Sequence, residues 1–167
     1  MSKQEVLSMS QTHVFEPQST TASKIVNQVT LINTAISKII GVQVGSNFDI
    51  LVKAQETGVK PEMVIHYMES HKLNRSSLDW VINAKTLSRR IKNEELLNSA
   101  ETDRFIRVAR LTALVETVFG NVEKAQDFLA KPRERWNGKT GSELMQTDNG
   151  GRMVEELLQQ LNHGFFA

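Results

Sequence analysis

The sequence predicts an all-α fold. Apolar residues recur at steps of three and four along most of the chain, which is the period of an amphipathic helix. No stretch alternates between apolar and polar residues for long, as a half-buried strand would. Aromatic residues make up 6% of the chain and proline occurs three times, so strand formers and helix breakers are both scarce. We therefore expect helices punctuated by capping residues, glycines and prolines.

The first 57 residues predict a polar tail and two helices. Residues 1–21 are rich in Ser, Thr and Gln with little periodic pattern, so we expect a mobile tail. Within the helical segment 22–57, a stripe of branched apolar residues predicts one helix that ends near Gly41. The stripe consists of Val26, Val29, Ile32, Ile36, Ile39 and Ile40. A second helix is expected from Ser46 to Thr57, before Gly58.

Residues 58–107 predict three short helices joined by tight turns. Pro61 at a first helical position opens one helix. Asn74 or Ser76 can cap a second helix that runs through Ile82, and Asn83 can cap a third, from Ala84 to Ile91. This order of short helices is the layout of a helix-turn-helix unit, a fold that commonly binds DNA.

Positive charge is concentrated in the same region. The stretch from Lys72 to Lys92 holds six basic residues and one acid, Asp79. In the third helix Leu87 and Ile91 face the core, which leaves a polar set that can face a DNA groove or its phosphates: Lys85, Thr86, Ser88, Arg89, Arg90 and Lys92. The alternative is an ordinary solvated helix face.

Residues 108–167 predict a small domain of further helices. Asn98 with Glu101 resembles a capping box that starts a long helix ending at Gly120. A helix from Val122 to Ala130 is expected to stop before Pro132.

Two further helix starts follow in the sequence. Thr140 with Glu143 predicts a second capping box and one turn of helix. Thr147 with Asp148 opens the final helix, whose acid suits the helix dipole. Its expected buried face is formed by Val154, Leu157, Leu158 and Leu161.

The sequence ends in an unusual pair of aromatic residues. Phe165 and Phe166 follow Gly164, and exposed rings after a flexible residue suggest a plug for a cavity in another protein. The alternative is that both rings fold back onto the protein's own core.

Several spaced motifs together carry a family resemblance. They are Phe119 to Leu129, Pro132, Asn137 to Thr140, Glu143 to Thr147, Gly151, and Val154 through Ala167. In this order they resemble the toxin-binding domain of Xre/ParS-type antitoxins. Upstream, Thr86 to Arg90, with Ser99, Glu101, Asp103 and Arg104, resembles the atypical helix-turn-helix of that family. The resemblance covers residues 58–167.

This resemblance implies an antitoxin of a type II toxin–antitoxin pair. Its partner would be a RES-domain toxin that consumes NAD or transfers its ADP-ribose, and the C-terminal end of the antitoxin would enter the toxin's active-site cleft and exclude NAD. The toxin-binding residues implied are Arg152, Glu155, Glu156, Gln159, Asn162, His163, Gly164, Phe165, Phe166 and Ala167. The helix-turn-helix implies a homodimer that binds inverted repeats in the operator DNA of its own operon.

The composition argues against several other classes. The chain has no cysteine, its four histidines lack ligand spacing, and it has neither a Gly-rich phosphate loop nor paired carboxylates, so we expect no metal, cofactor or catalysis. Without a long apolar run or a signal peptide, we expect a soluble cytoplasmic protein. Two alternatives stay open: a stand-alone transcriptional repressor, and a helical adaptor that binds only protein.

Overall fold

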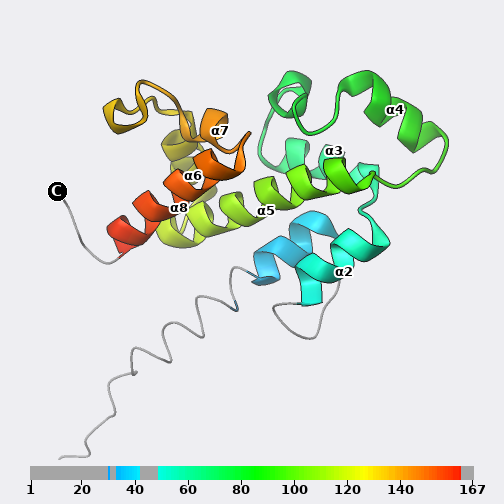
Figure 1. Ribbon diagram of the computed structural model, residues 1–167, viewed down its shortest axis with the longest axis horizontal. Coiled ribbons are helices and arrows are strands. Elements are labelled where there is room, and N and C mark those ends of the chain that lie inside the picture. The colour runs from blue at the N-terminus through cyan, green and yellow to red at the C-terminus, as the bar shows by residue number, and fades with distance from the viewer. Residues whose placement is uncertain (1–29, 31–32, 42–48, 163–167) are drawn as a thin grey trace, which may run out of the picture.

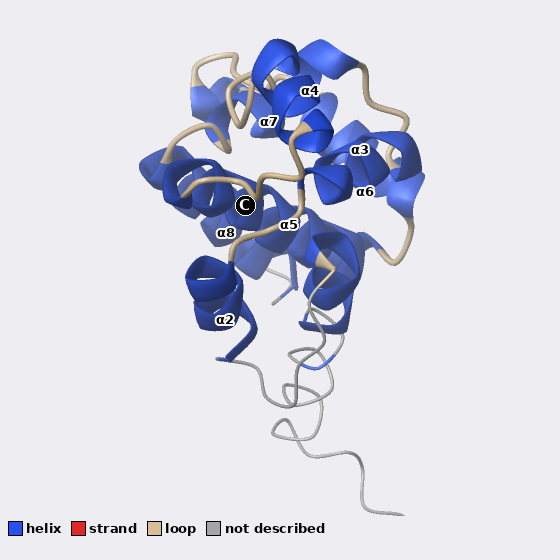
Figure 2. Ribbon diagram, turned by 90° about the vertical axis from the view of Figure 1, so that its right-hand side faces the viewer, coloured by secondary structure: helices blue, strands red, loops and turns tan. Residues whose placement is uncertain are grey.

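The structure is a computed structural model that describes residues 30, 33–41 and 49–162, and the regular structure within these ranges is helical (Figures 1 and 2). This confirms the all-α fold class. Residues 33–40 are helical and Gly41 ends the helix with a positive φ. The elements that follow are α2 (Asp49–Thr57), α3 (Pro61–Ser70), the 3-10 helix η1 (Arg75–Leu78), α4 (Ala84–Lys92), α5 (Ser99–Phe119), α6 (Val122–Ala130), the 3-10 helix η2 (Glu134–Trp136), α7 (Gly141–Leu144) and α8 (Asp148–Asn162).

The long helix α5 organises the fold. It runs through the middle of the molecule (Figure 1), and α2, α6 and α8 pack against it. Its apolar stripe is buried as expected, from Phe105 through Val108, Leu111 and Val115. The expected boundary between residues 107 and 108 falls in the middle of this helix. A single hydrophobic cluster extends from Ile36 to Leu158, so α5 contributes to the core on both sides of that boundary.

The helix starts are set by local capping, as the sequence predicts. The Asn83 side chain accepts a hydrogen bond from the Thr86 backbone N–H at 2.9 Å. Asn98 and Glu101 form a complete capping box at the start of α5, and Thr140 and Glu143 form another at α7. These bonds satisfy backbone N–H groups that the first turn of a helix leaves without a partner.

The second short helix expected within residues 58–107 is shorter in the structure than the sequence predicts. Asn74 caps it, but it is a single 3-10 turn that ends at Leu78 instead of running through Ile82. Beyond it, Val81 and Ile82 are buried because the turn folds them against neighbouring helices. The spacing of these apolar residues therefore predicted a helix where the structure has a buried turn.

Close contact between α7 and α8 depends on a glycine. A Cβ atom at Gly150 would lie 2.1 Å from the carbonyl oxygen of Leu144, a distance that atoms do not reach. With glycine there, α8 begins directly on the end of α7 and lays Val154, Leu157 and Leu158 into the core.

Some expectations concern residues that lie outside the described ranges. These are the tail at 1–21, the helical residues Val26, Val29 and Ile32, the helix start at Ser46, and the segment His163–Ala167. None of the helices in the described ranges is both long and apolar enough to cross a lipid bilayer.

Candidate DNA-binding and toxin-binding surfaces

The helix α4 presents one exposed polar face. Lys85, Ser88, Arg89 and Lys92 are exposed, and their spacing of three and four residues places them along one side of the helix. Leu87, between them in sequence, is buried. Thr86 is partly exposed and lies in the first turn beside the cap. Four of the six predicted DNA-binding residues are therefore exposed on α4, and Thr86 is partly exposed.

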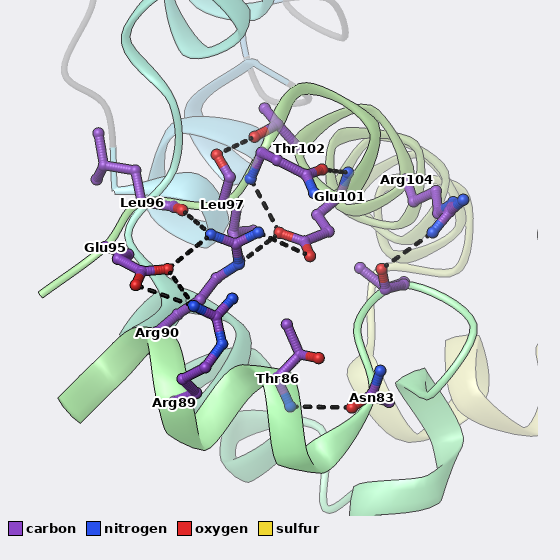
Figure 3. Close-up of polar contacts among 12 residues, drawn as sticks. Asn83, Thr86, Arg89, Arg90, Glu95, Leu96, Leu97, Glu101, Thr102 and Arg104 are labelled. Atoms are coloured by element: carbon purple, nitrogen blue, oxygen red, sulfur yellow. Dashed lines mark hydrogen bonds and ion pairs between the residues drawn. The ribbon is translucent and has the colours of Figure 1, made fainter. Parts of the chain in front are cut away.

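Arg90 has a different environment from the one expected. Its side chain is only 12% exposed, and its Nε lies 2.8 Å from the carboxylate of Glu101, which is 10% exposed. Its Nη1 also donates to the carbonyl of Leu96 at 3.0 Å (Figure 3). Because Glu101 belongs to the capping box of α5, Arg90 fixes the end of α4 onto the start of α5. The expected orientation towards a phosphate backbone is not the one seen here.

Arg89 lies on the outside of the same turn of helix. Its side chain is 53% exposed, and its Nη1 donates to both carboxylate oxygens of Glu95, at 3.0 and 2.9 Å (Figure 3). A hydrogen bond from Asn93, together with the positive charges of Arg89 and Arg90, lowers the pKa of Glu95 below its usual value. Sequence reasoning missed Glu95, because it lies beyond the end of the helix and reaches Arg89 only through the fold of the loop.

The region around α4 is connected to the C-terminal half through polar contacts at α3. The hydroxyl groups of Tyr67 and Thr112 are 2.7 Å apart, and Nε2 of His71 lies 2.9 Å from Glu116. Burial disfavours the charged form of His71, but its bonds to Glu116 and to the Tyr67 carbonyl outweigh burial and raise the pKa of His71. These groups line a cleft of about 480 Å3 between α3 and η1 on one side and α6 and α7 on the other.

The helix α8 exposes a second polar face. Arg152, Glu156 and Gln159 are exposed, as expected for a binding surface, and Asn162 is exposed at the end of the helix. Glu155 instead faces α5, where its carboxylate lies 2.5 Å from Arg110. The remaining predicted toxin-binding residues, His163, Gly164, Phe165, Phe166 and Ala167, lie outside the described ranges.

Two residues that the sequence reading did not select enlarge the α8 face. Met153 is 41% exposed beside Arg152, and an exposed methionine adapts readily to a partner surface. Gln160 accepts a hydrogen bond from Arg135 at 3.1 Å, which brings η2 next to the helix. The helices α8 and α4 lie toward opposite ends of the molecule (Figure 1).

Comparison with known proteins identifies the family of the chain. The family described as the antitoxin Xre/MbcA/ParS C-terminal toxin-binding domain matches residues 114–164, a segment that begins inside α5 and includes all of α8. A protein from Pseudomonas putida described as "Antitoxin Xre" is 33% identical over 123 residues, which cover 74% of this chain and 77% of the relative. The chain therefore belongs to the Xre family of antitoxins, and its C-terminal part is a toxin-binding domain of the Xre/MbcA/ParS type.

Proposed function

We propose that this antitoxin inhibits a RES-domain toxin, which consumes NAD or transfers its ADP-ribose, by covering the active site with its C-terminal segment. The observation that carries the proposal is the placement of α8. Its apolar side is buried on α5, its opposite side exposes Arg152, Glu156 and Gln159, and it immediately precedes residues 163–167. A helix held in this way offers a rigid platform from which a short aromatic segment can enter a pocket.

The two phenylalanines supply the expected anchoring. Burying a Phe side chain contributes about 1.5–3 kcal/mol, and aromatic residues are common among the side chains that dominate interface affinity. Phe165 directly follows Gly164, so it is the stronger candidate for the anchor. Inhibition would follow from steric exclusion of NAD from the cleft.

Co-expression with the product of the adjacent reading frame tests this proposal. We expect the full chain to protect growth and cellular NAD, whereas a chain that ends at His163 still binds the toxin through α8 but protects neither. A Phe165→Ala variant should protect growth and NAD less than the full chain and more than the shortened chain. Phe166→Ala serves as the matched comparison. Equal protection by the full and shortened chains would show that the surface of the folded domain, and not the C-terminal segment, inhibits the toxin. A neighbour that is harmless alone would favour the stand-alone repressor.

A second proposed activity is repression of the antitoxin's own operon by a homodimer bound to inverted repeats. The exposed face of α4 favours it, because Lys85, Arg89 and Lys92 line one side of a helix whose other side is packed on α3. We assign base and phosphate contacts to Lys85, Thr86, Ser88, Arg89 and Lys92, and a supporting role to Arg90. A mobility-shift experiment with duplex DNA from upstream of the gene tests it, with tighter binding than to random duplex as the expected result.

A further inference from the structure

The contact between Arg89 and Glu95 has the chemistry of the contact that Arg89 would make with DNA. A carboxylate and a phosphate both present two acceptor oxygens to a guanidinium group. In the structure both oxygens of Glu95 lie within 3.0 Å of Nη1 of Arg89. Glu95 therefore occupies hydrogen-bonding capacity of the exposed Arg89 guanidinium group that would otherwise be available to nucleic acid.

The carboxylate is held in place from more than one direction. Besides Arg89, it accepts hydrogen bonds from Nδ2 of Asn93 at 2.9 Å and from Nη1 of Arg90 at 3.2 Å. Asn93 is the C-cap residue of α4, and Arg90 is fixed to Glu101, so both donors are part of the framework of the fold. A negative charge is thus positioned beside Arg89 by the protein itself, and Glu95 keeps these two donors when Arg89 turns away.

We propose that Glu95 is a specificity-determining residue of the DNA-binding surface, which competes with phosphate for Arg89 and thereby weakens binding to DNA of arbitrary sequence. The inference rests on the proposed DNA binding of α4 and adds the residue that regulates it. DNA that offers only backbone phosphates must displace the carboxylate and tolerate its charge. A site that also offers base contacts compensates for this cost, so the ratio of specific to non-specific affinity rises.

The size of the effect follows from the salt dependence of DNA binding. Each additional effective cation steepens the slope of log K against log salt concentration by about 0.9. Removal of the Glu95 charge restores roughly one effective cation, which corresponds to an increase of about fivefold to tenfold in non-specific affinity at 0.1 M salt. Operator affinity should rise by less.

The test compares Glu95→Gln with Glu94→Gln in the full chain. Glu94 is the adjacent exposed acid, so its variant removes the same charge from the same loop without touching the Arg89 contact. Binding is measured to a duplex from upstream of the gene and to a random duplex of equal length, at several salt concentrations. Retention on heparin gives a readout that needs no operator. Melting curves check that each variant keeps its fold, which we expect because Arg90 retains Glu101 and the Leu96 carbonyl.

We expect Glu95→Gln to bind random duplex about fivefold to tenfold more tightly than wild type, with a salt slope steeper by about one, and to gain clearly more than Glu94→Gln. In an Arg89→Ala background the gain from Glu95→Gln should fall to that of Glu94→Gln. Equal gains from both acid variants, an excess gain of Glu95→Gln that persists without Arg89, or weaker binding by Glu95→Gln would overturn the inference.

Failure of the proposed repression has a separate signature. In that case wild type would bind the upstream duplex no better than the random one, while heparin retention would still report on Glu95. Later elution of Glu95→Gln than of Glu94→Gln would then support the competition with anionic groups, and identical elution would reject it.

Discussion

The helices α4 and α8 carry the two proposed binding faces, and they are attached to the molecule in different ways. The helix α8 packs against α5 and contributes three buried apolar side chains to the core, those of Val154, Leu157 and Leu158. The helix α4 buries Leu87 alone and is held at its end by Arg90, through Glu101 and the backbone of the loop that follows.

Because of this difference, the position of the α4 face depends on charged contacts, whereas the position of the α8 face depends on apolar packing. Apolar burial is not subject to electrostatic screening by salt, whereas ion pairs are screened and depend on the charge state and geometry of each partner. A substitution inside α8 should therefore act on folding first. A substitution in the arginine pair of α4 can act on folding or on DNA binding, according to which arginine is changed.

The largest expected effect is a cavity under α8. Leu158 is fully buried, so Leu158→Ala should lower the free energy of unfolding by about 3 kcal/mol, measured by urea denaturation. The adjacent exposed residue provides a control, since Gln159→Ala should change stability by less than about 0.5 kcal/mol. A loss below about 1 kcal/mol for Leu158→Ala would show that α8 does not depend on this packing.

The next effect separates the two neighbouring arginines. Arg90→Ala leaves the mostly buried Glu101 carboxylate without its cation and should cost about 2 kcal/mol of stability. Arg89→Ala breaks an exposed pair and should cost less than about 1 kcal/mol. DNA affinity should respond in the opposite order once each variant is measured well below its melting temperature. Similar stability losses for the two variants would contradict the assignment of a structural role to Arg90 and not to Arg89.

The smallest expected effect concerns the contact between α3 and α5, at His71 and Glu116. Because the pKa of His71 is raised in the folded protein, its contribution to stability is present below about pH 6.5 and is lost as pH rises through the folded pKa. The free energy of unfolding of wild type, measured by urea denaturation, should exceed that of His71→Gln by roughly 1 kcal/mol near pH 6 and by less at pH 8.5. A constant difference across this range would exclude a charged His71.

The sequence predicted helix starts well where a capping residue sets them. Asn83, Asn98 with Glu101, and Thr140 with Glu143 act through bonds to residues three positions away, so their pattern is visible in the chain itself. The sequence predicted that the second short helix extends to Ile82, whereas η1 ends at Leu78. Val81 and Ile82 are buried in the turn that follows, so their apolar character reflects burial and not helix formation.

The site residues were predicted less evenly, for a physical reason. Periodicity placed Lys85 and Arg89 on an exposed face of α4, because one turn of helix determines which side chains share a side. The same reasoning placed Arg90 on the outside and did not include Glu95, because their partners lie beyond the helix. On α8 the residues implied by the family resemblance include the exposed Arg152 and Gln159, but also Glu155, which faces α5.

By itself, the sequence determined the helical class, the capped helix starts and the family to which the antitoxin belongs. Only the tertiary structure decided that Arg90 supports the fold, that Glu155 faces Arg110, and that Glu95 neutralises Arg89. Capping and helical periodicity act over three or four residues, whereas these ion pairs join separate segments. Their geometry exists only after α4, the following loop, α5 and α8 have packed together.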